Sequence, residues 1–373
     1  MFFLHVENIR LINYRNYDNL YMELNKKTNI FIGKNAQGKT NLLEAIYMCA
    51  RGRSFRTNRD REIINFEKDQ AYVGANMNIG DFDKFIEIKM ERNKTKRIKV
   101  NKRELKNYKE LYSGLNVVVF SPEDLNLIKG GPQERRNFLN QEISQIKPVY
   151  HHNISRYNKV LFQRNNALKS AKFKKNMASI LDVFDLQLIK LGSEIIIERD
   201  RYIEELSHIS NRVHKKTTSG SEDLNLRYST NIDIYENKED MERRYLKKLK
   251  ENISKDMETS FTEFGPHRDD MQMFINDKDL KTFGSQGQQR TGVLSIKLSE
   301  VELINRQVGS YPVLLLDDVF SELDEDRRKY LIESFKDMQT IITITDAIEI
   351  NDLMDSEHSV FYIENGHLID GRK

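Results

Sequence analysis

Hydrophobic and polar residues alternate along the first hundred residues in the manner of β-strands. Alternation over residues 2–12 and again over 29–33 predicts two strands, the second of which runs into a glycine-rich turn followed by a helix. Three more alternating runs lie between residues 71 and 100, and a polar turn at 91–96 joins the last two into a predicted hairpin. The chain therefore begins with a β-rich segment that one helix interrupts.

The middle of the chain changes to helical spacing. After a buried strand predicted at 116–120, residues 121–140 open a long helical region. Apolar residues at helical intervals predict a helix ending near residue 170 and a second ending near 213; they are Ile154, Tyr157, Leu161 and Leu168, then Leu181, Phe184, Leu188, Leu191 and Ile195. With the basic link 169–176 between them, two helices of ~35 residues would pair as an antiparallel arm on the order of 50 Å long.

Strands and helices alternate again in the last third. Residues 285–307 predict a helix, 311–318 a buried strand ending in two acids, 323–337 a helix and 340–345 another buried strand. Short apolar strands separated by helices are typical of an α/β fold with a mainly parallel sheet.

Composition is that of a folded chain kept in a reducing compartment. Of 373 residues 38% are hydrophobic and 31% charged, which is outside the range of disordered proteins. Cys49 is the single cysteine and cannot form an internal disulfide. The longest apolar runs are far shorter than the ~18 residues of a membrane helix, and the start lacks a basic leader before an apolar block. We therefore expect a cytoplasmic protein that makes no membrane contact.

Positive charge is concentrated in three places although the formal net charge is only +3. Residues 84–109 hold 11 Lys or Arg against three acids, and residues 143–181 hold eight with no acid. The third cluster comprises Arg51, Arg53, Arg56, Arg59 and Arg61. Each run alone is more often a solvated face than a binding surface, and the lysine-rich hairpin is equally well explained as a protected sheet edge.

The strongest motif is the phosphate-loop pattern G-x-x-x-x-G-K-[ST], which lies between a predicted strand and a predicted helix as the motif requires. In such a loop backbone N–H groups surround phosphate oxygens, the Lys39 ammonium reaches the β and γ phosphates, and the Thr40 hydroxyl binds Mg²⁺. The expected ATP-binding residues are Gly33, Lys34, Asn35, Ala36, Gln37, Gly38, Lys39 and Thr40.

A second element is the buried strand that ends in Asp317 and Asp318. Next to a phosphate loop, Asp317 is expected to hold Mg²⁺ through water, while Asp318 polarises the attacking water. Asp318 and Lys39 are thus the candidate catalytic residues.

A third element distinguishes among phosphate-loop proteins. The segment SQGQQR at 285–290 lies 27 residues before Asp317 and resembles the S-G-G-Q signature of ABC-type ATPases. In that class the serine and glycine cap the γ-phosphate held by the opposite subunit, so the ATP-contacting residues here would be Ser285, Gln286, Gly287 and Gln288. Taken alone, the segment is as well explained as a polar helix cap. Residues 321–324 occupy the position of the D-loop, which contacts the dimer partner.

Together these motifs resemble the RecF family of the ABC/SMC-like ATPases over essentially the full chain. Further matching segments are SPEDLNLIKGGPQERRNFLN at 121–140, RYN and QRNNAL within 156–168, FGPHRDDM at 264–271 and LLLDDVFSELD at 314–324. The resemblance implies an ABC-type head with a mixed sheet (residues 1–118 and 300–373) and a helical arm lobe (119–299) that carries SQGQQR and lacks a long coiled coil. It also implies ATP and Mg²⁺ as cofactors, an ATP-dependent homodimer and DNA binding. Roles in recombinase loading at gaps, SOS induction and replication restart with RecR and RecO, at the nucleoid, follow from the resemblance alone.

Several departures from the wider ABC pattern bear on turnover. The acidic pair is Asp-Asp where transporter ATPases have Asp-Glu, Thr345 and Asp346 stand where those proteins have a histidine, and no Q-loop glutamine is evident near residues 116–124. We therefore expect a weak, DNA-stimulated ATPase. The alternative is a phosphate-loop ATPase or kinase with a non-DNA substrate, but a kinase has no need of SQGQQR.

DNA contacts are expected to be independent of sequence, since basic residues neutralise phosphates and no base-reading module is present. Both duplex and single-stranded DNA are expected partners. The candidate residues are Arg51, Arg53, Arg56, Arg59, Lys94, Lys96 and Arg97.

Overall fold

The computed structural model describes residues 4–80, 82–106, 111, 114–170, 177–234, 237–345 and 357–369. Its internal contacts divide the chain into two compact units, of residues 1–124 with 297–373 and of residues 125–296. The sequence-based lobes place these divisions at 118/119 and 299/300. Each unit is described by itself.

The first unit contains an antiparallel sheet of six strands in the order β2-β1-β4-β5-β6-β7. The hairpin predicted from alternation is confirmed as β5 and β6, with Lys89 opposite Arg97 and Glu91 opposite Lys94. The strands are β1 (Leu4–Tyr14), β2 (Tyr17–Glu23), β4 (Gln70–Ile79), β5 (Phe82–Glu91), β6 (Lys94–Val100) and β7 (Arg103–Glu104).

A second sheet of the same unit has the order β15-β14-β3-β13-β12-β8. The neighbouring strands β14, β3, β13, β12 and β8 all run parallel, and β15 pairs antiparallel with β14. This confirms the expected mixed sheet. β3, β12 and β13 are buried along their whole length, which explains why apolar residues predominate in all three sequences. The strands are β3 (Thr28–Ile32), β8 (Val117–Phe120), β12 (Val313–Asp317), β13 (Thr340–Ile344), β14 (His358–Glu364) and β15 (His367–Ile369).

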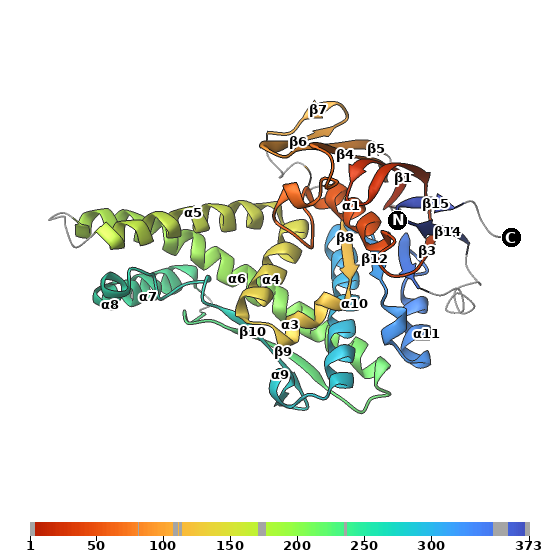
Figure 1. Ribbon diagram of the computed structural model, residues 1–373. Helices are drawn as coiled ribbons and strands as arrows, with labels where there is room; N and C mark the ends of the chain where they lie inside the picture. Colours follow the sequence, from red (N-terminus) through yellow and green to blue (C-terminus); the bar gives the residue numbers. More distant parts are fainter. Residues whose placement is uncertain are drawn as a thin grey trace. The chain divides into compact units, whose positions relative to one another are not determined.

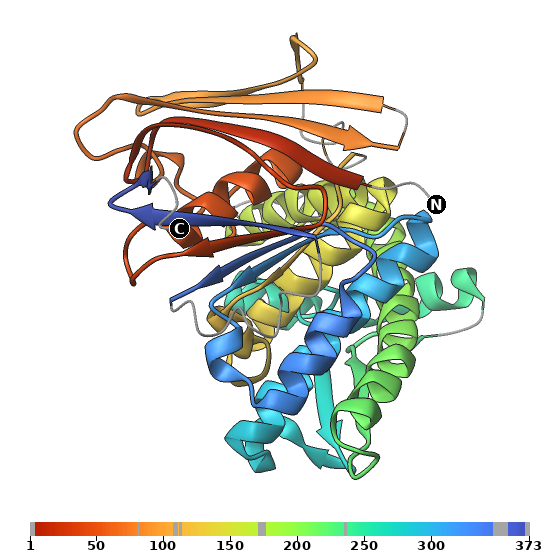
Figure 2. The ribbon, with the colours of Figure 1, turned by 90° about the vertical axis from the view of Figure 1, so that its right-hand side faces the viewer.

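Helix α1 (Lys39–Arg51) joins the two sheets into one core. It lies between the sheet layers in Figure 2 and contacts strands of both, including β4 and β12. Ile46 of α1, Val73 of the antiparallel sheet and Leu315 of the mixed sheet belong to the same buried cluster. The beginning of α1 is therefore held rigidly where the phosphate-loop motif ends. The unit also contains the short helices η1 (Asp60–Glu62) and η4 (Phe320–Glu322), and α11 (Glu325–Ser334).

The second unit is mainly helical, with a three-stranded sheet in the order β11-β10-β9. Within the described residues, no helix combines the length and the hydrophobicity needed to cross a membrane. Two elements cross the boundary between the units: η2 (Pro122–Leu125), and α10 (Gln286–Val308), which belongs to the first unit from Lys297 on. The elements that lie wholly in the second unit are α3 (Asn126–Lys129), α4 (Pro132–Ile146), α5 (Pro148–Ser170), α6 (Met177–Thr217), β9 (Leu224–Ser229), α7 (Lys238–Glu251), α8 (Ile253–Thr259), β10 (Asp270–Ile275), β11 (Lys278–Asp279) and α9 (Leu280–Phe283).

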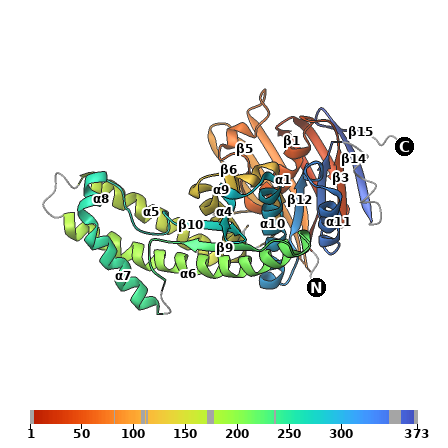
Figure 3. The ribbon, with the colours of Figure 1, turned by 90° about the horizontal axis from the view of Figure 1, so that it is seen from below.

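The expected arm is present as α5 and α6, which lie side by side in Figures 1 and 3 and share a long contact. The prediction of two helices of equal length was wrong. α6 has 41 residues, or ~62 Å at 1.5 Å per residue, whereas α5 has 23. The first helical segment breaks because Pro148 lacks an N–H and forces Lys147 into an extended conformation, with φ −124° and ψ 94°. Residues 171–176 of the basic link lie outside the described part.

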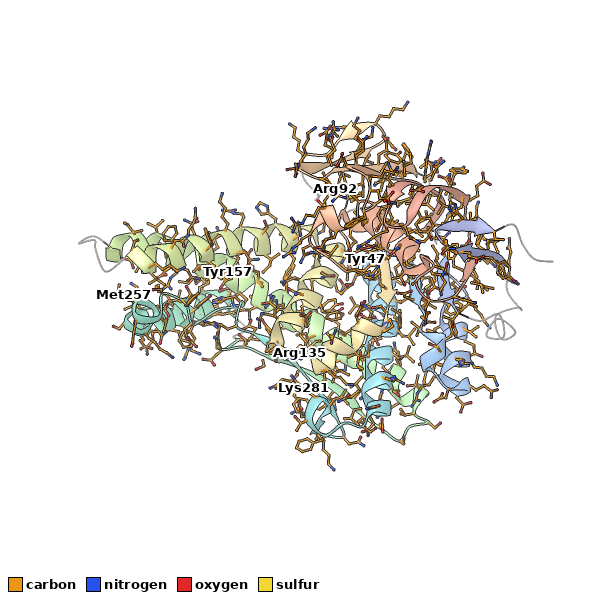
Figure 4. The ribbon with its side chains drawn as sticks, viewed as in Figure 1. Tyr47, Arg92, Arg135, Tyr157, Met257 and Lys281 are labelled. Atoms are coloured by element: carbon orange, nitrogen blue, oxygen red, sulfur yellow. The ribbon has the colours of Figure 1, made fainter. Side chains whose placement is uncertain are left out.

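Two family-like segments of this unit form a buried polar core. The Arg164 guanidinium, fully buried, donates to Asp185 Oδ1 and to Asp256 Oδ2, both at 2.6 Å. Tyr157, labelled in Figure 4, donates to His267 Nδ1 at 2.7 Å, since His267 Nε2 donates to the Thr262 carbonyl. Burial lowers the pKa of His267 to about 4. The buried ion pairs of Arg164 therefore stabilise the arm, because removing one partner of a buried ion pair costs ~3–5 kcal/mol of folding stability.

Candidate functional site

The phosphate loop lies between the end of β3 and the first turn of α1. Its chain passes through the left-handed region at Ala36 (φ 65°) and at Gly38 (φ 114°). A Cβ at Gly38 would lie 2.6 Å from the Asn16 side-chain nitrogen, so this position requires glycine for both its φ and its neighbours. A turn of this kind directly before a helix start is the backbone arrangement that anion sites use.

Residues far from the motif hold this loop in place. Asn16 Nδ2 and the Gly366 backbone N–H both donate to the Gln37 carbonyl, at 2.9 and 3.0 Å, and the Tyr17 hydroxyl donates to the Gly38 carbonyl at 3.0 Å. Asn16 and Tyr17 follow the β1 strand, and Gly366 lies in the β14–β15 turn. None of the three is predicted from the sequence, because the phosphate-loop motif contains no signal for them.

Lys39 is directed into the loop that it terminates. Its Nζ donates to the carbonyls of Gly33 and Lys34, the latter at 3.1 Å. Burial lowers the pKa of the Lys39 ammonium, and the nearby carboxylates of Asp318 and Asp317 partly oppose that shift. A cation placed beside the first turn of a helix fits the phosphates of a nucleotide.

The two acids at the end of β12 have different surroundings. Asp317 Oδ1 accepts hydrogen bonds from the Thr40 and Thr343 hydroxyls, each at 2.8 Å. Asp318 has a positive φ of 53°, and its backbone N–H donates to Thr343 Oγ1 at 3.0 Å. Thr343 therefore fixes both acids at the strand end, a role that the sequence analysis missed because its position in β13 carries no motif.

The donor set suits Mg²⁺. Thr40 and Asp317, adjacent through a hydrogen bond, supply a hydroxyl and one carboxylate. The described residues contain no group of three His, Cys, Asp or Glu that could hold an ion by themselves. Mg²⁺ typically takes one or two protein ligands and completes its octahedron with water and substrate phosphates. These residues therefore fit a metal that arrives with a nucleotide.

The signature segment forms the capped start of α10 in the second unit. Ser285 Oγ accepts from the Gln288 N–H at 3.2 Å, and Gln288 Oε1 accepts from the Ser285 N–H at 2.9 Å, which is a reciprocal capping box. Ser285, Gln286 and Gly287 are exposed. A Cβ at Gly287 would meet no described atom closer than 3.9 Å, so nothing in the described part of the chain requires glycine there.

The D-loop position, residues 321–324, begins directly after the acidic pair. Ser321 Oγ donates to the Asp318 carbonyl at 2.8 Å, and Asp324 caps α11 by accepting from the Arg327 N–H at 3.0 Å. The segment is thus fixed to the strand that carries Asp317 and Asp318. Thr345 and Asp346 stand where transporter ATPases have a histidine. Of these two residues, Asp346 lies outside the described part of the chain.

The arginine cluster after α1 is only partly a surface. Arg51 was wrongly included among the candidate DNA contacts, since its side chain is 1% exposed and its guanidinium lies 5.9 Å from the centre of the Tyr47 ring. Arg56 donates to Asn41 Oδ1 at 2.8 Å, while Arg59 is 68% exposed beside Glu62. Arg53 is half-buried and Arg61 exposed. The part of the cluster that is exposed enough to contact DNA is therefore its end, at Arg59 and Arg61.

The hairpin residues differ in the same way. Lys94 and Arg97 are 71% and 53% exposed and both contact Glu91. Lys96 is only 9% exposed and pairs with Asp60 at 2.8 Å, so its charge is already engaged within the chain. Arg92, labelled in Figure 4, donates to the carbonyls of Lys68, Asn65 and Phe66 and fixes the preceding loop. Residues 107–109 lie outside the described part.

Comparison with known proteins supports one assignment throughout the chain. Residues 5–368 match the family model described as RecF/RecN/SMC N terminal domain. The protein is 47% identical over 362 residues to the DNA replication and repair protein RecF of Clostridium botulinum, covering 97% of this chain and 98% of that protein. It is 46% identical over 366 residues to the protein of the same name from Clostridium beijerinckii, covering 98% of both chains.

Solved structures agree with the sequence comparisons. A structure of the recombination mediator protein RecF-ATP in the RecFOR pathway superimposes with a TM-score of 0.92 at 35% identity, covering 99% of this chain and 98% of that one. The corresponding RecF-ATPrS structure gives 0.90 at 35% identity, with 98% of both chains covered. An Smc head domain from Pyrococcus furiosus gives 0.55 at 16% identity, covering 98% and 95%, and shares the fold. The chain, with its ABC-type ATPase head and no long coiled coil among its described residues, thus belongs to the RecF family of DNA replication and repair proteins.

Proposed function

We propose that this protein is an ATP-dependent DNA-binding protein of recombinational repair and replication restart. ATP bound by the phosphate loop of one copy is capped by the signature segment of a second copy, so nucleotide binding drives dimerisation on DNA. The observation that carries the proposal is the signature segment itself, whose Ser285 and Gly287 are exposed at a capped helix start, with open space around Gly287 among the described residues. RecF structures with bound ATP, at 35% identity, support it.

Each residue of the phosphate site has a definable task. Lys39 gives up its bonds to the Gly33 and Lys34 carbonyls and donates to phosphate oxygens instead. Thr40 and Asp317 orient Mg²⁺, which when bound neutralises charge on the phosphates. Asp318, held by Thr343, is the group that orients water. Its side chain is one methylene shorter than glutamate, which is consistent with slow hydrolysis.

The surroundings of Ser285 favour a dimer. Phe283, two residues earlier, is 70% exposed at the end of α9, so an aromatic surface borders the signature segment. Burial of such a ring by a second copy would contribute to association.

We further propose that the dimer binds RecR and RecO, supports recombinase loading at gaps and SOS induction, and works in the cytoplasm at the nucleoid. The RecFOR pathway named for the relatives supports these assignments.

The DNA surface of this proposal can be tested with the exposed part of the arginine cluster. The double variant Arg59→Ala with Arg61→Ala should weaken DNA binding several-fold and reduce the log-log salt slope by up to ~1.8, since each lost phosphate contact removes ~0.9. ATP binding should be unchanged, because neither side chain bonds to the phosphate loop. Fluorescence anisotropy with duplex and single-stranded DNA of several sequences, from 50 to 200 mM salt with ATP, measures both quantities.

A matched control removes two arginines elsewhere. Arg243→Ala with Arg244→Ala on α7 has the same charge change at exposed positions, and should leave affinity and slope unaltered. Equal losses in both double variants would mean that net charge alone attracts DNA. An unsubstituted protein that does not bind DNA with ATP would refute the proposed function.

Hydrolysis provides an independent test. Asp318→Asn keeps the size of the side chain but removes the charge that polarises water, so ATP turnover should fall by at least ~10²-fold. ATP binding should persist, and the variant should accumulate as an ATP-bound dimer on DNA. Phosphate release and light scattering measure the two effects. Turnover at the parental rate would assign the water-orienting role to another residue.

A further inference from the structure

The signature segment is attached to a part of the second unit that no motif marks. α6 ends at Thr217, and the loop that follows carries Glu222. Glu222 Oε1 accepts a hydrogen bond from Gln288 Nε2 at 2.9 Å, and Glu222 Oε2 lies 3.1 Å from His214 Nε2. Because a carboxylate can only accept, His214 donates through Nε2. Glu222 therefore joins the last turn of α6 to the first turn of α10.

This link has a rigid base. His214 is completely buried, and its Nδ1 lies 3.0 Å from the hydroxyl of Ser295, two turns further along α10. The imidazole is thus held from both nitrogens, and it fixes the carboxylate that meets Gln288. The Glu222 side chain is 20% exposed. It therefore connects the buried His214 ring to the solvent-exposed signature segment.

The bond from Gln288 decides which way its side-chain amide faces. With Nε2 donated to Glu222, Oε1 must face the Ser285 N–H, and this is the orientation that the capping box needs. If the amide turned over, an NH₂ group would oppose the N–H of Ser285 and the cap would be lost. In the observed state the Ser285 oxygen accepts from the Gln288 N–H and its own proton is available to a phosphate oxygen.

We infer that Glu222, held by His214, is a positioning residue for the signature segment. It orients Gln288, and through Gln288 it fixes the Ser285 hydroxyl and the adjoining N–H groups that cap the γ-phosphate of ATP bound by the second copy. The inference rests on the proposed ATP-dependent dimer and adds residues that lie outside every nucleotide motif. It also gives α6 a direct connection to the dimer surface within one unit.

The test compares dimerisation with nucleotide binding in one set of variants. In Glu222→Ala the amide of Gln288 loses its orienting partner, so the dimer dissociation constant with ATP should rise about tenfold, while ATP affinity of the monomer stays within about twofold. Glu222→Gln keeps an acceptor for Gln288 and should restore most of the dimer affinity. Sedimentation with and without ATP measures dimerisation, and a fluorescent ATP analogue measures binding.

Glu251→Ala on α7 is the matched control, since that carboxylate is 63% exposed and far along the chain from α10. Thermal unfolding of every variant without ATP must match the parent, and Glu222→Asp replaces Glu222→Ala if the latter does not fold. Unchanged dimerisation in Glu222→Ala, or equal losses in the Ala and Gln variants, would overturn the inference while leaving the proposed function intact. Failure of the unsubstituted protein to dimerise with ATP would instead refute the proposed function.

Discussion

Replacing Lys39 with methionine is expected to abolish ATP binding, with a rise in dissociation constant of at least ~100-fold. In the proposed ATP complex the ammonium would supply two or more charge-assisted hydrogen bonds to phosphates, each worth ~1.5–3 kcal/mol, and 1.4 kcal/mol is a factor of ten. Methionine fills a similar volume, and burial already disfavours the charged ammonium there, so the fold should be retained. Titration calorimetry with ATP and Mg²⁺ measures the loss.

The control for this variant lies on the same loop. Lys34→Met makes the identical substitution at an exposed position whose carbonyl, rather than its side chain, contacts Lys39. Its ATP affinity should stay within about threefold of the parent. Comparable losses at both positions would show that general positive charge, and not the placement of Lys39, accounts for binding.

Replacing Ser285 with arginine is expected to eliminate the ATP-dependent dimer while ATP binding by the separate chains persists. The new side chain would break the capping box with Gln288 and occupy the space in front of Gly287 where a partner's phosphate should enter. A long cation cannot be accommodated in a tightly packed interface, so the dimer dissociation constant should increase by at least ~100-fold. Light scattering with ATP decides the result.

Ser254→Arg on α8, also exposed, introduces the same charge away from the signature segment and should dimerise normally. A mixture of the Lys39→Met and Ser285→Arg chains offers one intact composite site, formed by the phosphate loop of the second and the signature of the first. Partial recovery of dimers in the mixture is the expected result. A Ser285→Arg protein that dimerises with ATP like its parent would disprove the composite site.

The phosphate loop could be read from the sequence because its residues are contiguous and each has a specific type. Asn16, Tyr17 and Thr343 could not be identified in this way. They lie roughly 20 to 300 residues from the phosphate loop and come close to it only in the folded chain, and their residue types are common in strands and turns. The sequence therefore predicts the candidate nucleotide-binding residues, but it does not predict the residues that hold them in place.

Two errors have simple physical origins. Arg51 follows Leu43 and Tyr47 at intervals of four, so helical geometry places it on the buried face of α1 despite its charge. Local charge counting ignored this periodicity. The break at Pro148 was overlooked because apolar spacing continues on both sides of it, although proline cannot continue a helix from the preceding turn.

The position of β3 in its sheet has a consequence for how the chain matures. β3 pairs with β13 on one side and with β14 on the other, strands that begin at Thr340 and His358, whereas the phosphate loop follows β3 directly. During synthesis the first 120 residues therefore leave the ribosome with a strand that is buried along its whole length in the finished sheet and has no partner until some three hundred codons later. The second unit, contiguous from 125 to 296, can form its contacts in the interval. Nascent chains should accordingly depend on chaperones that shield β3, and ribosomes stalled before codon 340 should carry a folded arm and no competent nucleotide site.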